Sequence, residues 1–365
     1  MKIICTQSDL QQKVRTVSRA VAVHSTIPIM ECILITAYDD EIRMTANNKE
    51  LGIETIVPGR VLDQGDVALD AKVFSDIISK LPQSDVHITT DDNFVTFINC
   101  ENSSFNISGR SGEDFAYLPQ IENDNYISIS EFALKQIIQK TIFAISSNES
   151  NITLTGELFE VHEDQLRIIA LDGHRVSIRY EKLKDSYGDE RVIVPGKTLN
   201  DLTKILEGDA EKEVNIYFTK NHVSFNFRDT LVISRLIEGK FIDVMRMVTD
   251  DYETKVTVNK ADLYSCIDRS TLLSKENDRK PIVMHITDEY MTIDMKSSLG
   301  SMREEISVVK EGKDLTIGFN PKFFTDALRE IEDEEVSLYM INYKCPCFIK
   351  NEEGTYIYMI LPVNM

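Results

Sequence analysis

Lys72-Val73-Phe74-Ser75-Asp76-Ile77-Ile78 is the stretch that decides the fold, because its pattern returns twice later in the chain. It recurs at residues 197–203 and again at residues 322–328, and the spacing is 125 residues both times (197 − 72 and 322 − 197). Each copy has apolar residues at helical spacing and follows an alanine, glycine or proline. The spacing predicts three similar parts with a helix at the same place in each.

A second set of helices is predicted ahead of the first, at residues 8–21, 130–145 and 259–272. Short alternating strands lie between the helices, for example at residues 41–46, 93–98 and 222–227. The period is far above the roughly 20–50 residues of a solenoid, so the copies are predicted to be domains. The fold class is therefore α+β, with three tandem similar domains that each contain two helices and many short strands.

Two polar, acidic stretches mark the predicted domain boundaries. They are Glu122-Asn123-Asp124-Asn125 and Thr249-Asp250-Asp251. We expect domains at residues 1–125, 126–251 and 252–365. A chain of 365 residues with 42% hydrophobic and 27% charged residues has the composition of folded domains with a sizeable core.

The composition also indicates a compartment. No apolar run approaches the roughly 18 residues of a membrane span, and the N-terminus lacks the apolar segment of a signal peptide. We therefore expect a cytoplasmic protein. The six cysteines are mostly far apart in apolar runs, which predicts reduced core thiols. Cys345-Pro346-Cys347 is a close pair but has no second Cys/His pair at zinc spacing, so no metal is predicted.

The charge leaves two interpretations open. A net charge of −20 argues against a nucleic-acid partner. Lysine and arginine nevertheless recur on the predicted helices, while acidic residues cluster elsewhere, as in residues 330–335. Such helices would line a surface for phosphates, or the basic residues would simply fill the solvated faces of amphipathic helices.

The polar loop Leu171-Asp172-Gly173-His174-Arg175-Val176 stands between two strand-like runs and resembles an active-site loop. One interpretation is a metal-dependent phosphoesterase that uses Asp172, Gly173, His174 and Arg175. Against it, the other histidines show no metal-binding spacing, and the chain has no GxSxG elbow or phosphate-cradling glycine loop. Asp172-Gly173 is also a common pair in a turn between two strands, because aspartate hydrogen-bonds the turn backbone and glycine adopts positive φ.

Five motifs in register resemble the bacterial β sliding clamp family, the processivity subunits of the replicative DNA polymerase. They span the chain in order and are Thr26–Ile29, Thr155–Glu160, Leu171–Arg175, Ile233–Phe241 and Met359–Val363. The resemblance implies the DNA-clamp fold, with two helices and two antiparallel sheets in each of the three domains. It also implies a head-to-tail homodimer whose six domains close into a ring around duplex DNA. It also implies no catalysis and no cofactor. A basic inner lining and an acidic exterior would then reconcile the net charge with DNA binding.

The resemblance implies partners and a site for them. The partners are the polymerase catalytic subunit, the clamp loader, and other polymerases and repair proteins that carry short clamp-binding peptides. The residues implied for the peptide pocket are Leu154, Leu171, Gly173, His174, Arg175, Val176, Ile242, Arg246, Met247, Met359 and Leu361, with Asn320, Phe323, Pro346, Pro362, Val363 and Met365 bordering its second part. Methionine, valine and leucine suit an adaptable apolar surface, and His174 and Arg175 supply hydrogen-bond donors.

Two further sets of residues follow from the same resemblance. Those implied for DNA binding are His24, Lys72, Lys80, Asn148, Lys197 and Lys204. Those implied for the dimer interface are Phe105 and Ile107 from one subunit against Leu272 and Leu273 from the other.

Three positions depart from the family pattern. His24 stands where arginine is frequent, Ile242 where proline is frequent, and Asn364 where many members have arginine. His24 lacks a permanent charge at neutral pH, and this is the one feature that favours an alternative, a ring scaffold without a replicative role. The other two departures concern peptide affinity.

Overall fold

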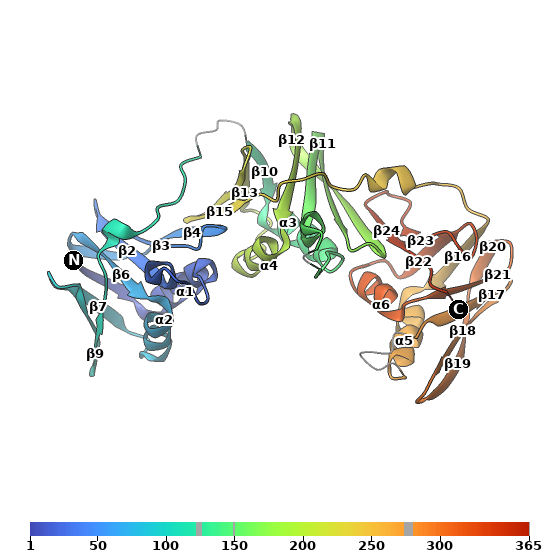
Figure 1. Cartoon of the computed structure of the whole chain (residues 1–365), viewed down its shortest axis with the longest axis horizontal. Helices are drawn as coiled ribbons and strands as arrows, with labels where there is room; N and C mark the ends of the chain where they lie inside the picture. The colour runs from blue at the N-terminus through green and yellow to red at the C-terminus, as the bar shows by residue number, and fades with distance from the viewer. Residues whose placement is uncertain (122–125, 149, 274–279, 365) are drawn as a thin grey trace. The chain divides into compact units, whose positions relative to one another are not determined.

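The computed structural model describes residues 1–121, 126–148, 150–273 and 280–364 (Figure 1). The chain falls into two units: Met1–Phe132 with Asn200–Leu236, and Ala133–Leu199 with Ile237–Met365. The boundary between the first two predicted domains, at residues 122–125, lies outside the described residues. Both boundaries stay predictions.

The described part of the chain contains six α-helices, two for each repeat. They are α1 (Gln7–Val17), α2 (Ala71–Lys80), α3 (Glu131–Ile142), α4 (Gly196–Ile205), α5 (Lys260–Thr271) and α6 (Pro321–Arg329). The three copies of the opening pattern lie in α2, α4 and α6, as predicted. The predicted helix at 8–21 is shorter, because a 3₁₀ turn at Ser18–Ala20 follows Val17.

Polar side chains fix where several helices begin. The Asp70 carboxylate accepts the N–H of Val73 at 2.8 Å at the start of α2. Asn259 accepts the N–H of Asp262 at 3.1 Å at the start of α5. These bonds satisfy N–H groups that have no partner within the helix.

Two antiparallel sheets build the first unit. The five-stranded sheet has the order β5 (Gly59–Asp63), β1 (Lys2–Thr6), β7 (Asp85–Thr90), β8 (Val95–Cys100) and β9 (Ser103–Ser108). The eight-stranded sheet has the order β10 (Tyr126–Ser130), β13 (Glu213–Phe218), β14 (His222–Phe227), β15 (Thr230–Arg235), β4 (Leu51–Val57), β3 (Glu41–Asn47), β2 (Cys32–Tyr38) and β6 (Gly65–Asp70).

Two further sheets build the second unit. The seven-stranded sheet has the order β11 (Gly156–Leu171), β12 (Arg175–Pro195), β24 (Tyr356–Ile360), β23 (Cys347–Lys350), β22 (Glu335–Met340), β16 (Thr254–Asn259) and β20 (Val309–Gly312). The four-stranded sheet has the order β19 (Gly300–Ser307), β18 (Tyr290–Ser297), β17 (Ile282–Ile286) and β21 (Leu315–Phe319).

Strands of successive repeats pair at two places, which we call the seams. At the first seam β15 pairs with β4, from Thr230 opposite Thr55 to Ser234 opposite Leu51. At the second seam β12 pairs with β24, with Arg175 opposite Ile360. Half-sheets of neighbouring repeats thus merge into one sheet, because hydrogen bonding across a seam satisfies strand edges that would otherwise stay open.

The helices bury one face each against these sheets. Leu10, Val14 and Val17 of α1 are almost completely buried, and α5 packs against α6 over the core of the third repeat. All six cysteines are free, and all but Cys345 are buried, as the sequence predicted. Across the described residues, every helix falls short of the length and apolarity that a membrane crossing requires.

Candidate functional site

The turn between β11 and β12 is built by its first residue. The Asp172 carboxylate accepts the N–H groups of His174 at 2.9 Å and Arg175 at 3.2 Å. Gly173 has φ +92°, a conformation that suits glycine. Asp172 and Gly173 therefore form a tight hairpin turn, and Gly173 and His174 are exposed at its tip.

Arg175 is buried and ties the turn to two other elements. Its guanidinium donates to Asp172 at 3.0 Å, to Asp326 of α6 at 2.6 Å, and to the carbonyl of Phe143 after α3 at 2.7 Å. It also lies 4.8 Å from the ring centroid of Phe323. Three of the five N–H groups of Arg175 are thus engaged inside the chain. This geometry makes Arg175 a positioning residue that holds the turn against α6.

His174 and the C-terminal segment meet on the outer side of the turn. The His174 ring stacks on Phe323, with centroids 6.1 Å apart and an interplanar angle of 17°. The His174 carbonyl accepts the N–H of Leu361 at 2.9 Å, and Val363 donates to the carbonyl of Gly318 at 2.9 Å. Leu361, Pro362 and Val363 are half-buried. The last residues are thus held beside the turn.

An apolar cluster lies next to the turn. Leu154, Leu171, Val176 and Met359 belong to one buried group, together with Phe241 and Val244. Beyond this cluster the chain leaves apolar side chains open to solvent, since Ile242 is 45% and Met247 46% exposed. Arg246 is also exposed and pairs with Asp243 at 2.8 Å.

The remaining residues predicted for the pocket have local roles. Asn320 accepts the N–H of Lys322 at 3.0 Å and so begins α6. Pro346 is half-buried in the turn before β23. Met365 lies outside the described residues. The structure thus brings the β11–β12 turn, the segment Phe241–Met247 and the chain end into one region, and the pocket role of the predicted residues stays a prediction.

Sequence reasoning missed residues that support this region. Phe143 and Asp326 hold Arg175 but are 32 and 151 residues away from it, so no local pattern connects them. Phe241 and Val244 are part of the apolar cluster. Phe241 ends the motif Ile233–Phe241, which was a signal for it, whereas Val244 lies outside the quoted motifs.

The residues predicted for DNA binding are exposed. Lys72 and Lys80 lie on α2, and Lys197 and Lys204 on α4. Across the part of the chain that the structure describes, Lys72, Lys80 and Lys197 make no ion pair, whereas Lys204 lies 3.9 Å from Asp201. His24 projects from a loop with φ +64°, and Asn148 is also in a loop. Their contact with DNA stays a prediction.

The residues predicted for the dimer interface lie on an outer strand and just after a helix. Phe105 and Ile107 are on β9, an outer strand of its sheet, and Phe105 is 41% exposed. Leu272 directly follows α5 and is 78% exposed, while Leu273 packs partly on the core of the third repeat.

Comparison with known proteins matches the whole chain to one family. Residues 1–119, 128–243 and 245–364 match the N-terminal, central and C-terminal domains of the DNA polymerase III beta subunit. The chain belongs to the DNA polymerase III beta subunit family. This membership confirms the expected fold of three clamp domains.

Individual members agree with this assignment. A Staphylococcus epidermidis protein named beta sliding clamp is 33% identical over 95% of this chain and 94% of its own length. The crystal structure of a putative DNA polymerase III beta subunit from Eubacterium rectale has 53% identity, with a TM-score of 0.97 and full coverage of both chains. The sliding clamp of Bacillus subtilis has 31% identity and a TM-score of 0.97, covering 100% of this chain and 99% of that one.

The beta subunit family is a non-catalytic processivity factor, so the turn at Asp172 is not an active site. In the structure the Arg175 guanidinium donates to Asp172 and Asp326, so both ends of the turn take part in bonds within the chain. Among the described residues, no three His, Cys, Asp or Glu side chains lie where they would hold a metal ion.

Proposed function

We propose that the chain is a sliding clamp that encircles duplex DNA as a head-to-tail homodimer and tethers the replicative polymerase to it. The observation that carries the proposal is a pair of open sheet edges, β9 and β19. Both are counterparts of strands that pair at the two seams.

The repeat identifies these counterparts. The third strand after the second helix of each repeat is β9, β15 or β24, and the third strand after α1 or α5 is β4 or β19. β15 pairs with β4 at the first seam, and β24 pairs with β12 at the second. β9 and β19 end their sheets in the described part of the chain. By the same pattern, a third seam would pair β9 of one copy with β19 of another copy.

Burial supports the same conclusion. Phe105 on β9 lies opposite Ile98, which is fully buried, yet Phe105 itself is 41% exposed. Its side chain is therefore on the core face of the sheet but lacks a cover. In a second copy Leu272 and Leu273 would supply that cover. Since every copy has both edges, two such contacts close a ring and leave neither β9 nor β19 unpaired.

The basic side chains on α2 and α4 support the DNA role. Exposed lysines neutralise phosphates without reading sequence, and such contacts weaken with salt. Long residence on DNA then depends on ring closure, because release requires opening a third seam.

The region around the β11–β12 turn supports partner binding. An apolar cluster with exposed Ile242 and Met247 beside it suits the apolar anchors of a short peptide. We propose that the polymerase, the clamp loader and other polymerases and repair proteins dock here. Two sites per dimer permit exchange of partners at high effective concentration.

The test uses a nicked circular plasmid and a matching ATP-driven clamp loader. Loaded protein is expected to stay on closed circles at a salt concentration that abolishes binding to linear duplex, and to leave when a restriction enzyme linearises the circle. Failure to stay on circles would contradict the proposal and favour a ring scaffold without a replicative role. Retention after linearisation would indicate ordinary DNA binding instead.

A further inference from the structure

The first seam contains a counterpart of the β11–β12 turn. Residues Asn47–Leu51 between β3 and β4 lie 125 positions before Asp172–Val176 (172 − 47), which is the spacing of the repeated helix. Asn47 accepts the N–H of Lys49 at 2.8 Å, as Asp172 accepts that of His174. Each turn contains a residue with a positive φ, although not at the same position: Lys49 (φ +74°) corresponds to His174, one residue after Gly173 (φ +92°).

The strand beside each turn also corresponds. Leu51 lies opposite Ser234 at the first seam and Val176 opposite Met359 at the second, and 359 − 234 is again 125. The region that we propose for peptide binding at the second seam therefore has a structural equivalent at the first seam, made of different side chains.

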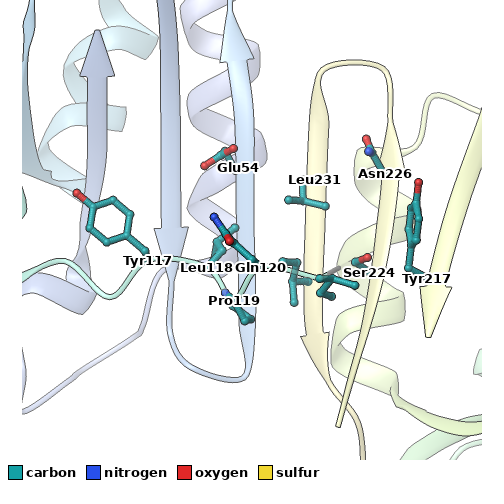
Figure 2. Close-up of a pocket in the computed structure, with 11 residues that line it drawn as sticks. Glu54, Tyr117, Leu118, Pro119, Gln120, Tyr217, Ser224, Asn226 and Leu231 are labelled. Carbon is teal, nitrogen blue, oxygen red and sulfur yellow. The ribbon is translucent and has the colours of Figure 1, made fainter. Parts of the chain in front are cut away.

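The linker after the first repeat is fixed across this equivalent region. The Asn47 amide donates to the carbonyl of Ala116 at 2.8 Å. The Leu118 side chain lies directly over Gly52, where a Cβ atom would overlap it. Figure 2 shows the linker running from Tyr117 across the strand of Glu54 to Gln120, on the side toward the strand of Leu231.

Two hollows flank this linker in the first unit. The smaller one has a volume of about 240 Å³, and the larger one about 940 Å³. They share Tyr117, Leu118, Pro119 and Ile233 as lining residues. In the larger hollow, Leu231, Asn226, Ser224 and Tyr217 face the linker from neighbouring strands (Figure 2). Together the hollows offer room for an extended peptide.

The charge of the smaller hollow differs from that of the molecule. Lys49, His222 and Arg235 line it, and within the described residues none of the three makes an ion pair. Glu50 is the acidic residue in its lining. In the larger hollow, Glu54 is held by Arg43 at 2.7 Å and by Thr45 at 3.2 Å. Two cations without an ion pair among the described residues, Lys49 and Arg235, therefore lie here in a chain of net charge −20.

We propose that the first seam is a second docking site, which binds an extended acidic peptide of a partner protein. Acidic side chains of the peptide pair with Lys49 and Arg235, and its apolar side chains pack beside Leu118 and Tyr117. The charge selects the partner, because an acidic peptide is repelled by most of the surface and attracted at this position. The second seam, with its exposed Ile242 and Met247, selects apolar anchors instead. The proposal goes beyond the function above and does not require it.

The probe is a fluorescein-labelled peptide of five Asp-Leu repeats, with five Ser-Leu repeats as the uncharged comparison. Fluorescence anisotropy with the full chain is expected to show at least tenfold tighter binding of the Asp-Leu peptide, and this preference should shrink as salt is added. Equal affinity for the two peptides, or no binding of either, would overturn the proposal.

Variants locate the site. Lys49→Glu with Arg235→Glu is expected to weaken Asp-Leu binding at least tenfold. Lys2→Glu with Arg60→Glu makes the same change in net charge on the five-stranded sheet of the same unit, where both side chains are exposed, and should leave binding within about twofold. If the control pair weakens binding as much, the effect is general repulsion and the proposal is wrong.

Two further measurements separate this site from the second seam and from misfolding. Deletion of residues 361–365 should leave Asp-Leu binding intact; loss of binding would place the peptide at the second seam and refute the proposal. In the unmodified chain, bound Asp-Leu peptide should protect Lys49 from acetylation by acetic anhydride while Lys80 stays reactive, as measured by mass spectrometry. Equal reactivity of Lys49 with and without peptide would also refute it.

Discussion

Glu157 shows what a single buried residue contributes. It stands at the start of β11 with no exposed surface, and neither carboxylate oxygen has a hydrogen-bond partner. Burial raises the pKa of Glu157 to about 8. Thr141 lies close enough to oppose part of that rise, but its hydroxyl donates to the carbonyls of Ile137 and Ile138. The carboxyl is thus protonated in the folded chain at neutral pH.

Glu157→Gln is expected to flatten the pH dependence of stability. An exposed glutamate in the unfolded chain ionises near pH 4.5, whereas Glu157 keeps its proton up to about pH 8 when folded. Its contribution is complete below pH 4.5 and is lost as the pH rises through 8, at about 1.4 kcal/mol per pH unit. Thermal unfolding of both proteins from pH 5 to 8 checks this. Parallel curves would show that Glu157 does not titrate in this range.

Arg175 makes a second prediction at the scale of the residue. Arg175→Met should destabilise the second unit by roughly 3–5 kcal/mol, because Asp326 and the Phe143 carbonyl lose their partner. Arg246→Ala is the matched control, since Arg246 is exposed and pairs with nearby Asp243, and it should change stability by less than about 0.5 kcal/mol. Urea unfolding measures both. If Arg175→Met unfolds at the same urea concentration as Arg246→Ala, Arg175 is not a positioning residue.

Among the elements, β9 is the strand that we propose for dimer assembly. Phe105→Glu is expected to turn the dimer into a monomer, since it places a charge where an apolar side chain worth roughly 1.5–3 kcal/mol would be buried. Phe97→Glu is the control, because Phe97 lies on the adjacent β8 with similar exposure, 39%, but on the opposite face of the sheet. Sedimentation equilibrium gives the masses. A Phe105→Glu dimer as stable as the unmodified one would place the interface elsewhere.

The chain end is the second element with a separable role. Deleting residues 361–365 removes the N–H of Leu361 that binds the His174 carbonyl and the N–H of Val363 that binds Gly318. The deletion should abolish binding of the polymerase and clamp loader, while the mass of the dimer stays the same because β9 and β19 are untouched. Pull-down and sedimentation on the same sample test both halves. Surviving polymerase binding would refute the pocket assignment.

At the scale of the whole molecule, the proposed ring closure and the proposed DNA contact should be separable. Phe105→Glu leaves Lys72, Lys80, Lys197 and Lys204 in place, so weak salt-sensitive binding to linear duplex should persist. Retention on closed circles should be lost, since an open molecule has no topological hold on DNA. Filter binding to linear duplex and gel filtration with circular plasmid measure the two. Retention of the variant on circles would show that closure does not cause residence.

The repeat also explains why the net charge is a poor guide at this scale. A charge of −20 describes the sum, whereas the partners that we propose would meet local surfaces such as the lysines of α2 or the group of Lys49 and Arg235. Only the arrangement of charges in space decides which partner is attracted.

The sequence by itself determined the three repeats, the two helix sets and the free core cysteines, because apolar periodicity and caps such as Asp70 act over a few residues. The sequence also contains the motifs of the family. Only the tertiary structure shows how a motif residue acts: Arg175 donates to Asp326, 151 residues away, and so holds the β11–β12 turn against α6. It also decided that half-sheets merge at seams while β9 and β19 stay open. Strand edges find their partners through long-range hydrogen bonds, and no local pattern in the sequence encodes which edges remain unpaired.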